Sequence, residues 1–495
     1  MKLIDVGKIK VSPFEFDSIL EVTIEKVLND HSTLYVCGII KDDKQFNPVT
    51  DNTEGVKIKC ENDGLVYFKG VLQSVRVTCV DAVYRLEAYA ISNTILLDTV
   101  KHKRSFQDNG QDYQAIINKV IADNSGSVTY NADAMTVENI ILQYNETDWE
   151  FAKRLASHTN DVLIPIIDDD PKFHFGATDA GGAKVDSKDY AISRNFNSIR
   201  SFSAPSSIEK SKDESPLEMS DDDVTLHTVE TDDFVCDIGE KISLNGTDLR
   251  VCRLSLSFVN SALTVVYTLC PKAAISAPKF YNPAITGLVI DGKVVEVEND
   301  TLKLDLTNEI GRDADLDDAY KGAGRGVEED TGEKHFFKYA TGYSMEKHTG
   351  WYVMPEEDDI VQLLFPIEDE KYAYATSSIR HGDTDKTADY MIKFWRTSYG
   401  KEIKMDEKEI LITGKDDETF IRINEDSGID IMTKKDIEIS CDGTMDIMSK
   451  KDMKIVTDAN LTIKGKNSIV AECSGSSIMM NSSKIDIKAT LIKEN

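Results

Sequence analysis

Histidine is the side chain best suited to bind a transition metal or to move protons near neutral pH. The chain has eight histidines, and no HExxH or HxH pair occurs among His31, His102, His158, His174, His227, His335, His348 and His381. Metal-binding motifs usually bring their histidines together at such short spacings. We therefore expect these histidines on the surface or in the core, with no bound metal and no cofactor.

The eight cysteines could serve as metal ligands, redox centres or disulfide partners. No CxxC pair occurs among Cys37, Cys60, Cys79, Cys236, Cys252, Cys270, Cys441 and Cys473, which argues against a zinc ribbon and a thioredoxin-like site. Several occupy alternate positions in β-like runs such as RVTCV, where a reduced cysteine acts as a small hydrophobic residue. We expect free thiols in a protein that folds in a reducing cytosol.

Three other motifs that could do chemistry each fail at a diagnostic position. Asp313, Asp315 and Asp317 resemble the start of a calcium-binding loop. Position 318 holds Asp where that loop needs Gly, and position 324 holds Gly where it needs Glu. The GAGRG segment lacks the Lys and Ser or Thr of a phosphate-binding loop, and no GxSxG element is present. The sequence therefore predicts no enzyme activity.

Composition limits the classes to which the protein can belong. Its 495 residues suffice for two to four domains, and 41% of them are apolar, which indicates packed cores. The formal net charge of −30 argues against nucleic-acid binding, because so acidic a surface repels phosphate backbones. No apolar run is long enough to span a membrane, and the N-terminal MKLIDVGKIKVSPFEFDS does not resemble a secretory signal peptide.

Alternating apolar and polar residues predict that most of the chain is β-structure. Residues 34–91 alternate in this way, which indicates antiparallel strands with one solvated face. Residues 252–258 and 263–269 alternate on either side of a short turn and predict a hairpin. Short β-runs over residues 282–381 are typical of a small barrel.

Two helices and one long loop are predicted between these strands. Apolar residues in 112–124 recur at helical spacing. A second helix begins at Thr147, because Thr147 and Glu150 have the spacing of a capping box. The strongly acidic segment 209–233 is expected to form an exposed loop.

The most specific pattern is a repeat of eight residues near the C-terminus. Nine blocks run without a gap from residue 419 to 490, beginning TFIRINED, SGIDIMTK and KDIEISCD. Positions three and five are apolar in almost every block: Ile421, Ile423, Ile429, Ile431, Ile437, Ile439, Met445, Ile447, Met453, Ile455, Leu461, Ile463, Ile469, Ile485 and Ile487. The eighth block departs, with Ser477 at position three. Two apolar side chains two residues apart share one face of a short strand, and the polar remainder of each block is expected to turn a corner. A fixed short period is typical of a β-solenoid.

Three such chains are predicted to wind around one axis. One block contributes only two modest apolar side chains, whereas three chains would bring about six together at each level and leave no long open edge. At ~4.8 Å per strand the nine blocks would form a stiff needle on the order of 40 Å long. Residues 391–495 hold 17 basic and 19 acidic residues, net −2, and residues 1–390 hold 40 and 68, net −28. The sequence therefore predicts a nearly neutral needle attached to an acidic base.

Four segments, in order along the chain, resemble the central spike of contractile injection systems. That family includes the VgrG proteins of type VI secretion and the hub-and-spike proteins of contractile phage tails. The segments are FKGVLQSVRVTCVDAVYRLEAYAI with RSFQDNGQDYQAIINKVI, ILQYNETDWEFAKRLASH, GWYVMPEEDDIVQLLFP and SYGKEIKMDEKEILIT. The second is similar to the family's QYNESDWEFLRRL helix. One departure is Asp359, where the family usually has Gly before the next strand.

The resemblance implies a mainly β fold: β-barrel hub domains with a small α/β insert, an OB-fold-like barrel and a C-terminal octad-repeat trimeric β-helix needle. The implied tube- and baseplate-docking hub covers residues 1–280, with its helical insert at about 105–200. The OB-fold-like barrel covers 281–385, the entry to the needle 386–418 and the needle 419–495.

The resemblance also implies a mechanical function without catalysis. A homotrimer would cap an inner tube, contact the baseplate and be driven transiently through a target membrane to deliver effector cargo. A PAAR-like tip protein would dock over Leu491 and Ile492. Before firing, the protein would lie in the cytoplasm within the apparatus, and it would leave without a signal peptide. The alternatives are a trimeric β-solenoid polysaccharide depolymerase and an adhesin stalk.

Overall fold

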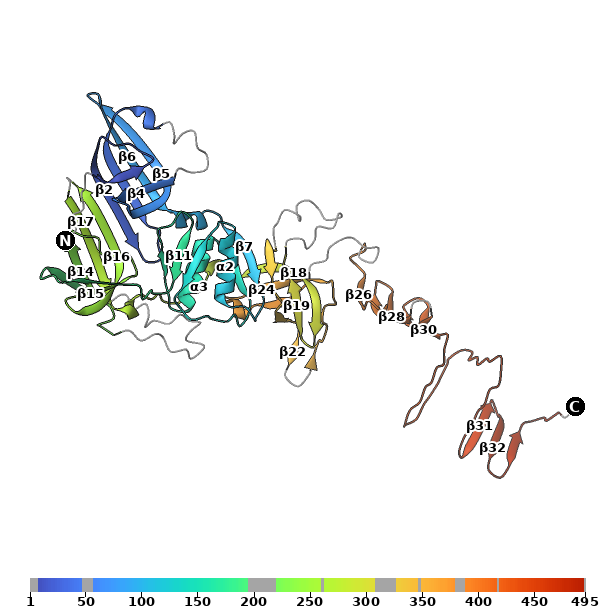
Figure 1. Cartoon of the computed structure of the whole chain (residues 1–495). Coiled ribbons are helices and arrows are strands. Elements are labelled where there is room, and N and C mark those ends of the chain that lie inside the picture. Colours follow the sequence, from blue (N-terminus) through green and yellow to red (C-terminus); the bar gives the residue numbers. More distant parts are fainter. Residues whose placement is uncertain are drawn as a thin grey trace. The chain divides into compact units, whose positions relative to one another are not determined.

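The computed structural model describes residues 8–46, 57–194, 220–259, 262–307, 326–345, 349–378, 388–415 and 418–493. The chain divides into two compact units, Met1–Gly382 and Asp383–Asn495 (Figure 1). Strands account for 48% and helices for 9% of the structure, which confirms the mainly β fold class. In the described part of the chain, no helix is long and apolar enough to cross a membrane.

The first unit begins with a sheet of twelve strands that forms a nearly closed barrel. Its strands are β1 Lys10–Ser12, β2 Ser18–Val27, β3 Thr33–Ile40, β4 Lys57–Asn62, β5 Leu65–Val80, β6 Val83–Ser92, β12 Gly181–Val185, β13 Tyr190–Arg194, β14 Thr225–Thr231, β15 Lys241–Leu244, β16 Thr247–Val259 and β17 Ala262–Cys270. The hydrogen-bonded order is β1-β4-β5-β6-β3-β2-β16-β17-β14-β13, and β15 joins β12 to β16. The described 3₁₀ segments of the unit are η2 Asp43–Phe46, η3 Asn93–Leu97, η4 Lys272–Ala274, η5 Pro283–Ile285 and η6 Glu370–Tyr372.

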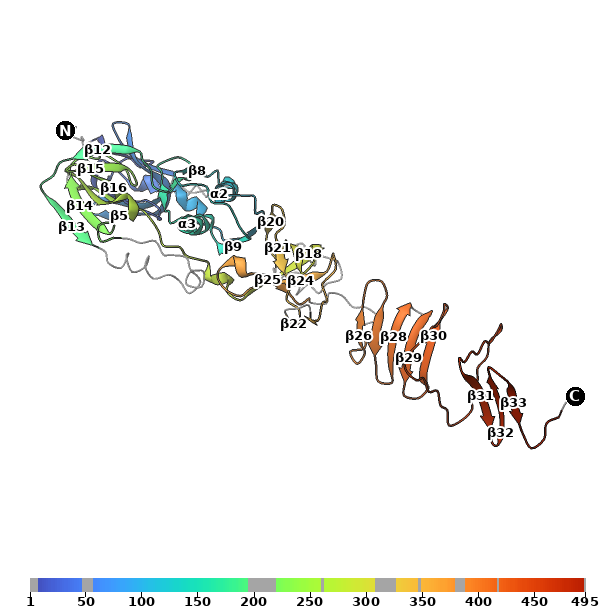
Figure 2. The same cartoon turned by 90° about the horizontal axis from the view of Figure 1, so that it is seen from below.

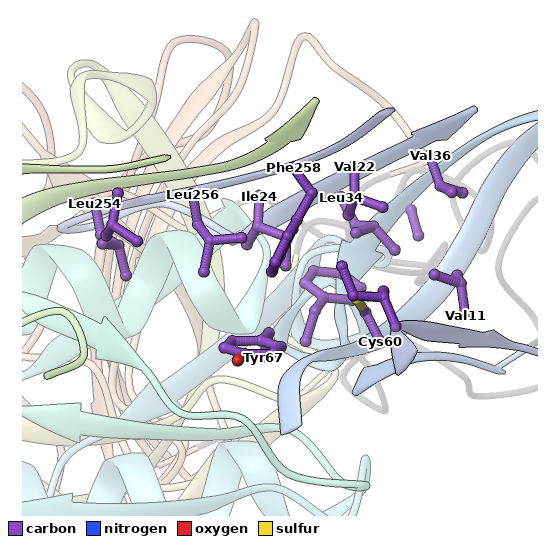
Figure 3. Close-up of a cluster of buried hydrophobic side chains, with 14 of the residues drawn as sticks. Val11, Val22, Ile24, Leu34, Val36, Cys60, Tyr67, Leu254, Leu256 and Phe258 are labelled. Carbon is purple, nitrogen blue, oxygen red and sulfur yellow. The ribbon is translucent and has the colours of Figure 1, made fainter. Parts of the chain in front are cut away.

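The inward side chains of this sheet form one apolar core (Figure 3). Val22 of β2 lies opposite Val36 of β3 and opposite Phe258 of β16, and none of the three is more than 1% exposed. Because the sheet curls, the alternating apolar face predicted from the sequence is covered by other strands of the same sheet.

The structure confirms one predicted element of this barrel and corrects another. The predicted hairpin is present as β16 and β17, with Leu254 opposite Tyr267. The loop expected over residues 209–233 is wrong in part: residues 209–219 lie outside the described residues, but Thr225–Thr231 is strand β14. Val229 of β14 is buried in the barrel core. The acidic residues around this strand concealed it, since a strand within a sheet needs few apolar side chains when its backbone is paired on both sides.

Both predicted helices are present in an insert between β6 and β12. They are α2 Tyr113–Ala122 and α3 Asp148–His158, and the strands of the insert are β7 His102–Phe106, β8 Ser127–Tyr130, β9 Ile141–Glu146, β10 Leu163–Pro165 and β11 Lys172–Phe175. The backbone N–H of Ala115 donates to Asp112 at the start of α2 (2.7 Å). Thr147 and Glu150 form the predicted capping box of α3, each side chain accepting from the other's backbone N–H. The apolar faces of both helices pack into a core of their own.

A smaller five-stranded sheet follows within the first unit. Its strands are β18 Leu288–Glu298, β19 Thr301–Asp305, β21 Phe336–Lys338, β24 Ile360–Phe365 and β25 Tyr374–Thr376, in the order β21-β19-β18-β24-β25. The short strands β22 Ser344–Met345 and β23 Thr349–Gly350 pair with each other, and β20 Glu329–Thr331 pairs with β7 of the insert. The turn before β24 has Asp358 in the left-handed region (φ 71°), and Asp359 accepts from the N–H of Glu356 (2.8 Å). The left-handed position of this turn is thus Asp358, and residue 359 has no positive φ that would require Gly.

A buried ionic network joins this sheet to the insert. The guanidinium of Arg154 on α3, which is fully buried, donates to Glu146 (2.8 Å), to Glu370 (2.9 Å) and to the carbonyl of Leu142 (2.8 Å). Burial raises the pKa of Glu370, and the charge of Arg154 opposes this rise. Glu146 and Arg154 belong to the segment that resembles the family helix. Its charged residues therefore serve to fix the insert on the neighbouring sheet.

The second unit contains two antiparallel sheets (Figure 2). The first comprises β26 Lys393–Arg396, β27 Glu402–Met405, β28 Glu409–Lys415, β29 Thr419–Asn424 and β30 Gly428–Thr433, and the second comprises β31 Ser468–Cys473, β32 Ser476–Asn481 and β33 Ile485–Lys488. Each strand pairs with the next one along the chain. Residues 434–467, all of them described, contain no strand. Within one chain the octads thus do not form one continuous ladder, and the trimeric β-helix stays a prediction.

Candidate assembly surface of the C-terminal unit

One face of the first C-terminal sheet is a continuous apolar surface. Directly opposed residues in an antiparallel sheet lie on the same face. The register places Ile412 opposite Ile403 and Ile421, and Ile421 opposite Ile431. A second row runs through Met405, Ile410, Ile423 and Ile429. All these side chains are exposed in the single chain, from 39% for Ile421 to 68% for Ile429.

This apolar face begins before the first octad, which the sequence analysis missed. Strands β26–β28 contribute Trp395, Ile403, Met405, Ile410 and Ile412 to the face, and none of these belongs to a block. The signal was present as the pairs Ile403/Met405 and Ile410/Ile412, each two residues apart. Their spacing from each other and from Ile421 is not eight, so a search by period alone could not find them.

The opposite face of the same sheet carries charged pairs. Arg422 of β29 forms an ion pair with Asp430 of β30, directly across the ladder. Lys404 bonds both Glu409 (3.3 Å) and Asp406 (2.9 Å). The bond from Lys404, with backbone N–H bonds from the next turn, lowers the pKa of Asp406 to about 2. This face also carries Leu411, Phe420 and Met432, so it mixes charged and apolar residues, whereas the first face is apolar throughout both rows.

Between the two sheets the chain turns a corner once per octad, as the sequence predicts. Bends fall on positions eight and one, at residues 434–435, 442–443, 450–451, 458–459 and 466–467. Three corners are closed by a hydroxyl at position seven, which accepts from the N–H two residues on: Thr433 from Lys435 (3.0 Å), Ser449 from Lys451 (3.2 Å) and Thr457 from Ala459 (3.2 Å). Such bonds favour turns over continued extended chain. Sequence reasoning missed these hydroxyls, although Ser or Thr recurs at position seven.

The predicted needle-core residues of this bent segment are exposed in the single chain. Their exposure ranges from 47% for Met445 to 73% for Ile447, and the set is Ile437, Ile439, Met445, Ile447, Met453, Ile455, Leu461 and Ile463. Monomeric proteins rarely leave contiguous apolar surface of this extent open. Their packing around a threefold axis stays a prediction, because it concerns contacts between chains.

The second sheet explains the departing eighth block. Ser474 and Gly475 form a tight turn with positive φ (37° and 87°) between β31 and β32. The register places Ile469 opposite Met480, and Ile478 opposite Ile487. Positions four and six of this block therefore take the places that positions three and five hold elsewhere. The two-residue turn shifts the pattern by one residue and keeps the apolar face intact.

The predicted tip-docking residues follow this sheet. Leu491 and Ile492 are 70% and 55% exposed and lie outside any strand. They present apolar surface, and their role in docking a tip protein stays a prediction.

Among the described residues, no three His, Cys, Asp or Glu side chains are placed to hold a metal ion. All eight cysteines are free thiols. Asp313, Asp315 and Asp317 lie outside the described residues.

Comparisons with known proteins give the fold of the chain. No family model and no curated protein sequence matches it. A chain of a Francisella PdpA–VgrG complex superposes with a TM-score of 0.55 at 10% identity, covering 88% of this chain and 81% of the other. The Escherichia coli c3393 protein superposes with a TM-score of 0.51 at 11% identity, covering 75% of this chain and 100% of the other. It is described as a component of the type VI secretion system with structural similarity to the T4 bacteriophage tail proteins gp27 and gp5.

At these identities the likeness is one of fold. The chain has the fold of VgrG-like proteins, as the four sequence segments predicted.

Proposed function

We propose that this protein is the structural central spike of a contractile injection system. Three copies assemble through the apolar faces of the C-terminal unit, cap an inner tube with the first unit and puncture the target envelope for effector delivery. The observation that carries the proposal is an eight-residue repeat of exposed apolar pairs with a corner at each repeat, in a chain with the fold of VgrG-like proteins. A stiff rod that is driven through a membrane needs rigidity and a narrow end, and it needs no catalysis.

The first unit is assigned to the tube and baseplate. Residues 1–390, which include this whole unit, carry a net charge of −28, and that charge favours a less acidic or basic docking surface. The VgrG-like neighbour was itself solved in a complex with another protein, PdpA. Association of this spike with other components of the apparatus is consistent with that example.

The C-terminal end is assigned to a small PAAR-like tip protein docked over Leu491 and Ile492, which carries or recruits the cargo. The exposed apolar side chains of these residues favour such a cap, because a blunt apolar end is poorly suited to enter a bilayer. The protein is proposed to wait in the cytoplasm as part of the apparatus and to be delivered on contraction.

Light scattering on the purified chain tests the assembly: a homotrimer is expected, and a monomer would refute the proposal. Deletion of residues 489–495 should leave the trimer intact and abolish binding of a tip protein. Cryo-microscopy of particles purified with their sheath should show the C-terminal unit leading and capped. A bare needle end on particles that still penetrate targets would refute the capping role.

A further inference from the structure

Two cysteines of the hairpin β16–β17 lie on the face of the sheet that is turned away from the barrel core. Their neighbours Val251 and Leu269 are directly opposed and belong to the barrel core. Cys270 instead belongs to a smaller apolar cluster that includes Ile164 of the insert, and Cys252 packs against this cluster. Cys270 is 1% exposed, whereas Cys252 is only partly buried. Both thiols are therefore in the same cluster, and one of them is accessible from its margin.

A β-bulge in β16 brings these two thiols together. Arg250 is opposite Cys270. Arg253, three residues further along β16, is opposite Thr268, which is only two residues back along β17. The extra residue places Cys252 nearer to Cys270 than a diagonal neighbour lies in a regular ladder. The thiol of Cys252 donates to the carbonyl of Thr268 (3.2 Å), and the thiol of Cys270 forms a hydrogen bond with Cys252.

This arrangement gives the two thiols different reactivity. The hydrogen bond from Cys270 lowers the pKa of Cys252, and the same bond, together with burial, raises the pKa of Cys270. The thiolate is the nucleophile in thiol–disulfide exchange, so the more exposed thiol with the lower pKa reacts first. These properties suit Cys252 to attack an external disulfide and Cys270 to resolve the product.

We propose that Cys252 and Cys270 are a redox pair that closes to an intrachain disulfide when the protein meets a small oxidising disulfide, such as oxidised glutathione. The Cys252 thiolate attacks one sulfur of oxidised glutathione, which forms a mixed disulfide and releases one glutathione thiolate. The Cys270 thiolate then attacks the sulfur of Cys252 and releases the second. Each departing thiolate takes up the proton that the attacking cysteine loses. The protein thus loses two electrons, and one glutathione disulfide is reduced to two thiols.

The disulfide pins the point at which the chain leaves the barrel. Cys270 is the last residue of β17, and the chain then runs along the insert, where the N–H of Ala277 donates to the carbonyl of Asn160 (3.2 Å). A spike that is made in a reducing cytosol and delivered outside it would keep the pair reduced before firing and oxidise it afterwards. Only this timing rests on the proposed function, because the closure itself needs no more than the pair and the oxidant.

Peptide mapping by mass spectrometry tests the pair in the full, folded chain. The exposed residues Cys79, Cys441 and Cys473 are replaced by Ser, so that only cysteines of the first unit can react. The protein is incubated with oxidised glutathione, denatured and alkylated, and its digest is searched for linked peptides. We expect one linkage, between Cys252 and Cys270, which dithiothreitol reverses. The transition temperature of the first unit should rise by a few degrees on oxidation, because the crosslink restricts the unfolded chain.

Single substitutions separate the roles of the two thiols. Cys270→Ser should accumulate the mixed disulfide of glutathione with Cys252, whereas Cys252→Ser should leave Cys270 reduced. The matched control is Cys236→Ser, which removes a buried thiol of the same barrel and should keep the linkage.

Three results overturn the inference: both thiols stay reduced in the folded parent, Cys252 stops at the mixed disulfide, or another pair of cysteines is linked. The parent protein alone can give each of them, so the test does not depend on the folding of the variants. None of these results changes the oligomeric state, so the proposed spike would stand. A protein that is monomeric by light scattering refutes the spike and leaves the redox pair intact.

Discussion

The strands of both units alternate apolar and polar residues, but the apolar face is buried in the first unit and exposed in the second. In the barrel of the first unit, Val22, Val36 and Phe258 are almost completely buried. In the second unit, the equivalent inward positions, such as Ile429 and Ile447, remain mostly exposed. The first sheet curls until its apolar face is covered by its own strands, whereas the second unit has no layer of its own to cover that face.

The difference supports the proposal that the second unit is complete only in an assembly. A sheet with one apolar face is stable when that face is packed against another layer. Fully burying one large aliphatic side chain contributes about 1.5–3 kcal/mol, and each octad offers two. The stability of the first unit is thus intrinsic, and that of the second depends on its partners. The following predictions test this contrast, beginning with the largest expected effect.

Charges in the predicted needle core should abolish assembly. Replacing Ile437 and Ile439 with Asp places about six carboxylates at one level of a trimer, each costing several kcal/mol if buried without a partner. Light scattering should show loss of the trimer or of its heat resistance, while the first unit stays folded. The control is Ser440→Asp, at position six of the same block. A double mutant that remains an equally heat-stable trimer refutes the octad argument.

Breaking the buried ionic network should destabilise only the first unit. Arg154→Ala leaves Glu370 and Glu146 without their partner, and removal of one member of a buried ion pair typically costs about 3–5 kcal/mol. Calorimetry should show a lower transition temperature for the first unit with the trimer retained. Arg253→Ala is the control, because the pair of Arg253 with Glu25 is largely exposed and is expected to contribute at most about 1 kcal/mol.

The loss of stability caused by Arg154→Ala should depend on pH in a defined direction. Burial raises the pKa of Glu370 above that of the unfolded chain, so the folded state binds a proton more readily. Without Arg154 this preference becomes stronger. The destabilisation by Arg154→Ala should therefore be largest at neutral pH and smaller as the pH falls towards the folded pKa of Glu370. Unfolding of the variant and the parent at pH 5 and pH 8 checks this; equal differences at both pH values would exclude a charged Glu370 as the cause.

The charge contrast between the units should decide which one docks to the tube. Residues 1–385 are expected to retain baseplate proteins in a pull-down, and the isolated needle is not. Because surface charges are screened over about 8–10 Å at physiological salt, binding by the first unit should weaken markedly as salt is raised. Equal binding by the needle alone would reverse the assignment of the two ends.

The corner hydroxyls should make the smallest contribution to the stability of the trimer. Thr457→Ala removes one side-chain bond to the N–H of Ala459, and a hydrogen bond of this kind contributes about 0.5–1.5 kcal/mol. The transition temperature of the trimer should fall by a few degrees. Thr462→Ala, at position four of the next block, is the matched control and should have little effect. If both substitutions lower the transition temperature equally, the corner bond has no specific role.

The sequence alone was sufficient to predict those helices, strands and turns that depend on residues close together in the chain. Helix α2 followed from apolar spacing, α3 followed from the capping box at Thr147, and the hairpin β16–β17 followed from alternation. The eight-residue corners were also local, since they depend on the polar residues of each block. The four family-like segments were sufficient to predict the fold that the structural comparisons confirm.

Tertiary structure decided what depends on pairing between distant or neighbouring strands. Strand β14 was missed because its place in the barrel depends on backbone partners in β13 and β17, which its acidic surroundings do not reveal. The apolar face over β26–β28 and the shifted eighth block emerged only from the strand register, because one residue of shift moves a side chain to the other face. Which octads pair within the chain also could not be read from a repeat whose blocks look alike. Local patterns specify which residues are apolar, and the register decides which of them share a surface.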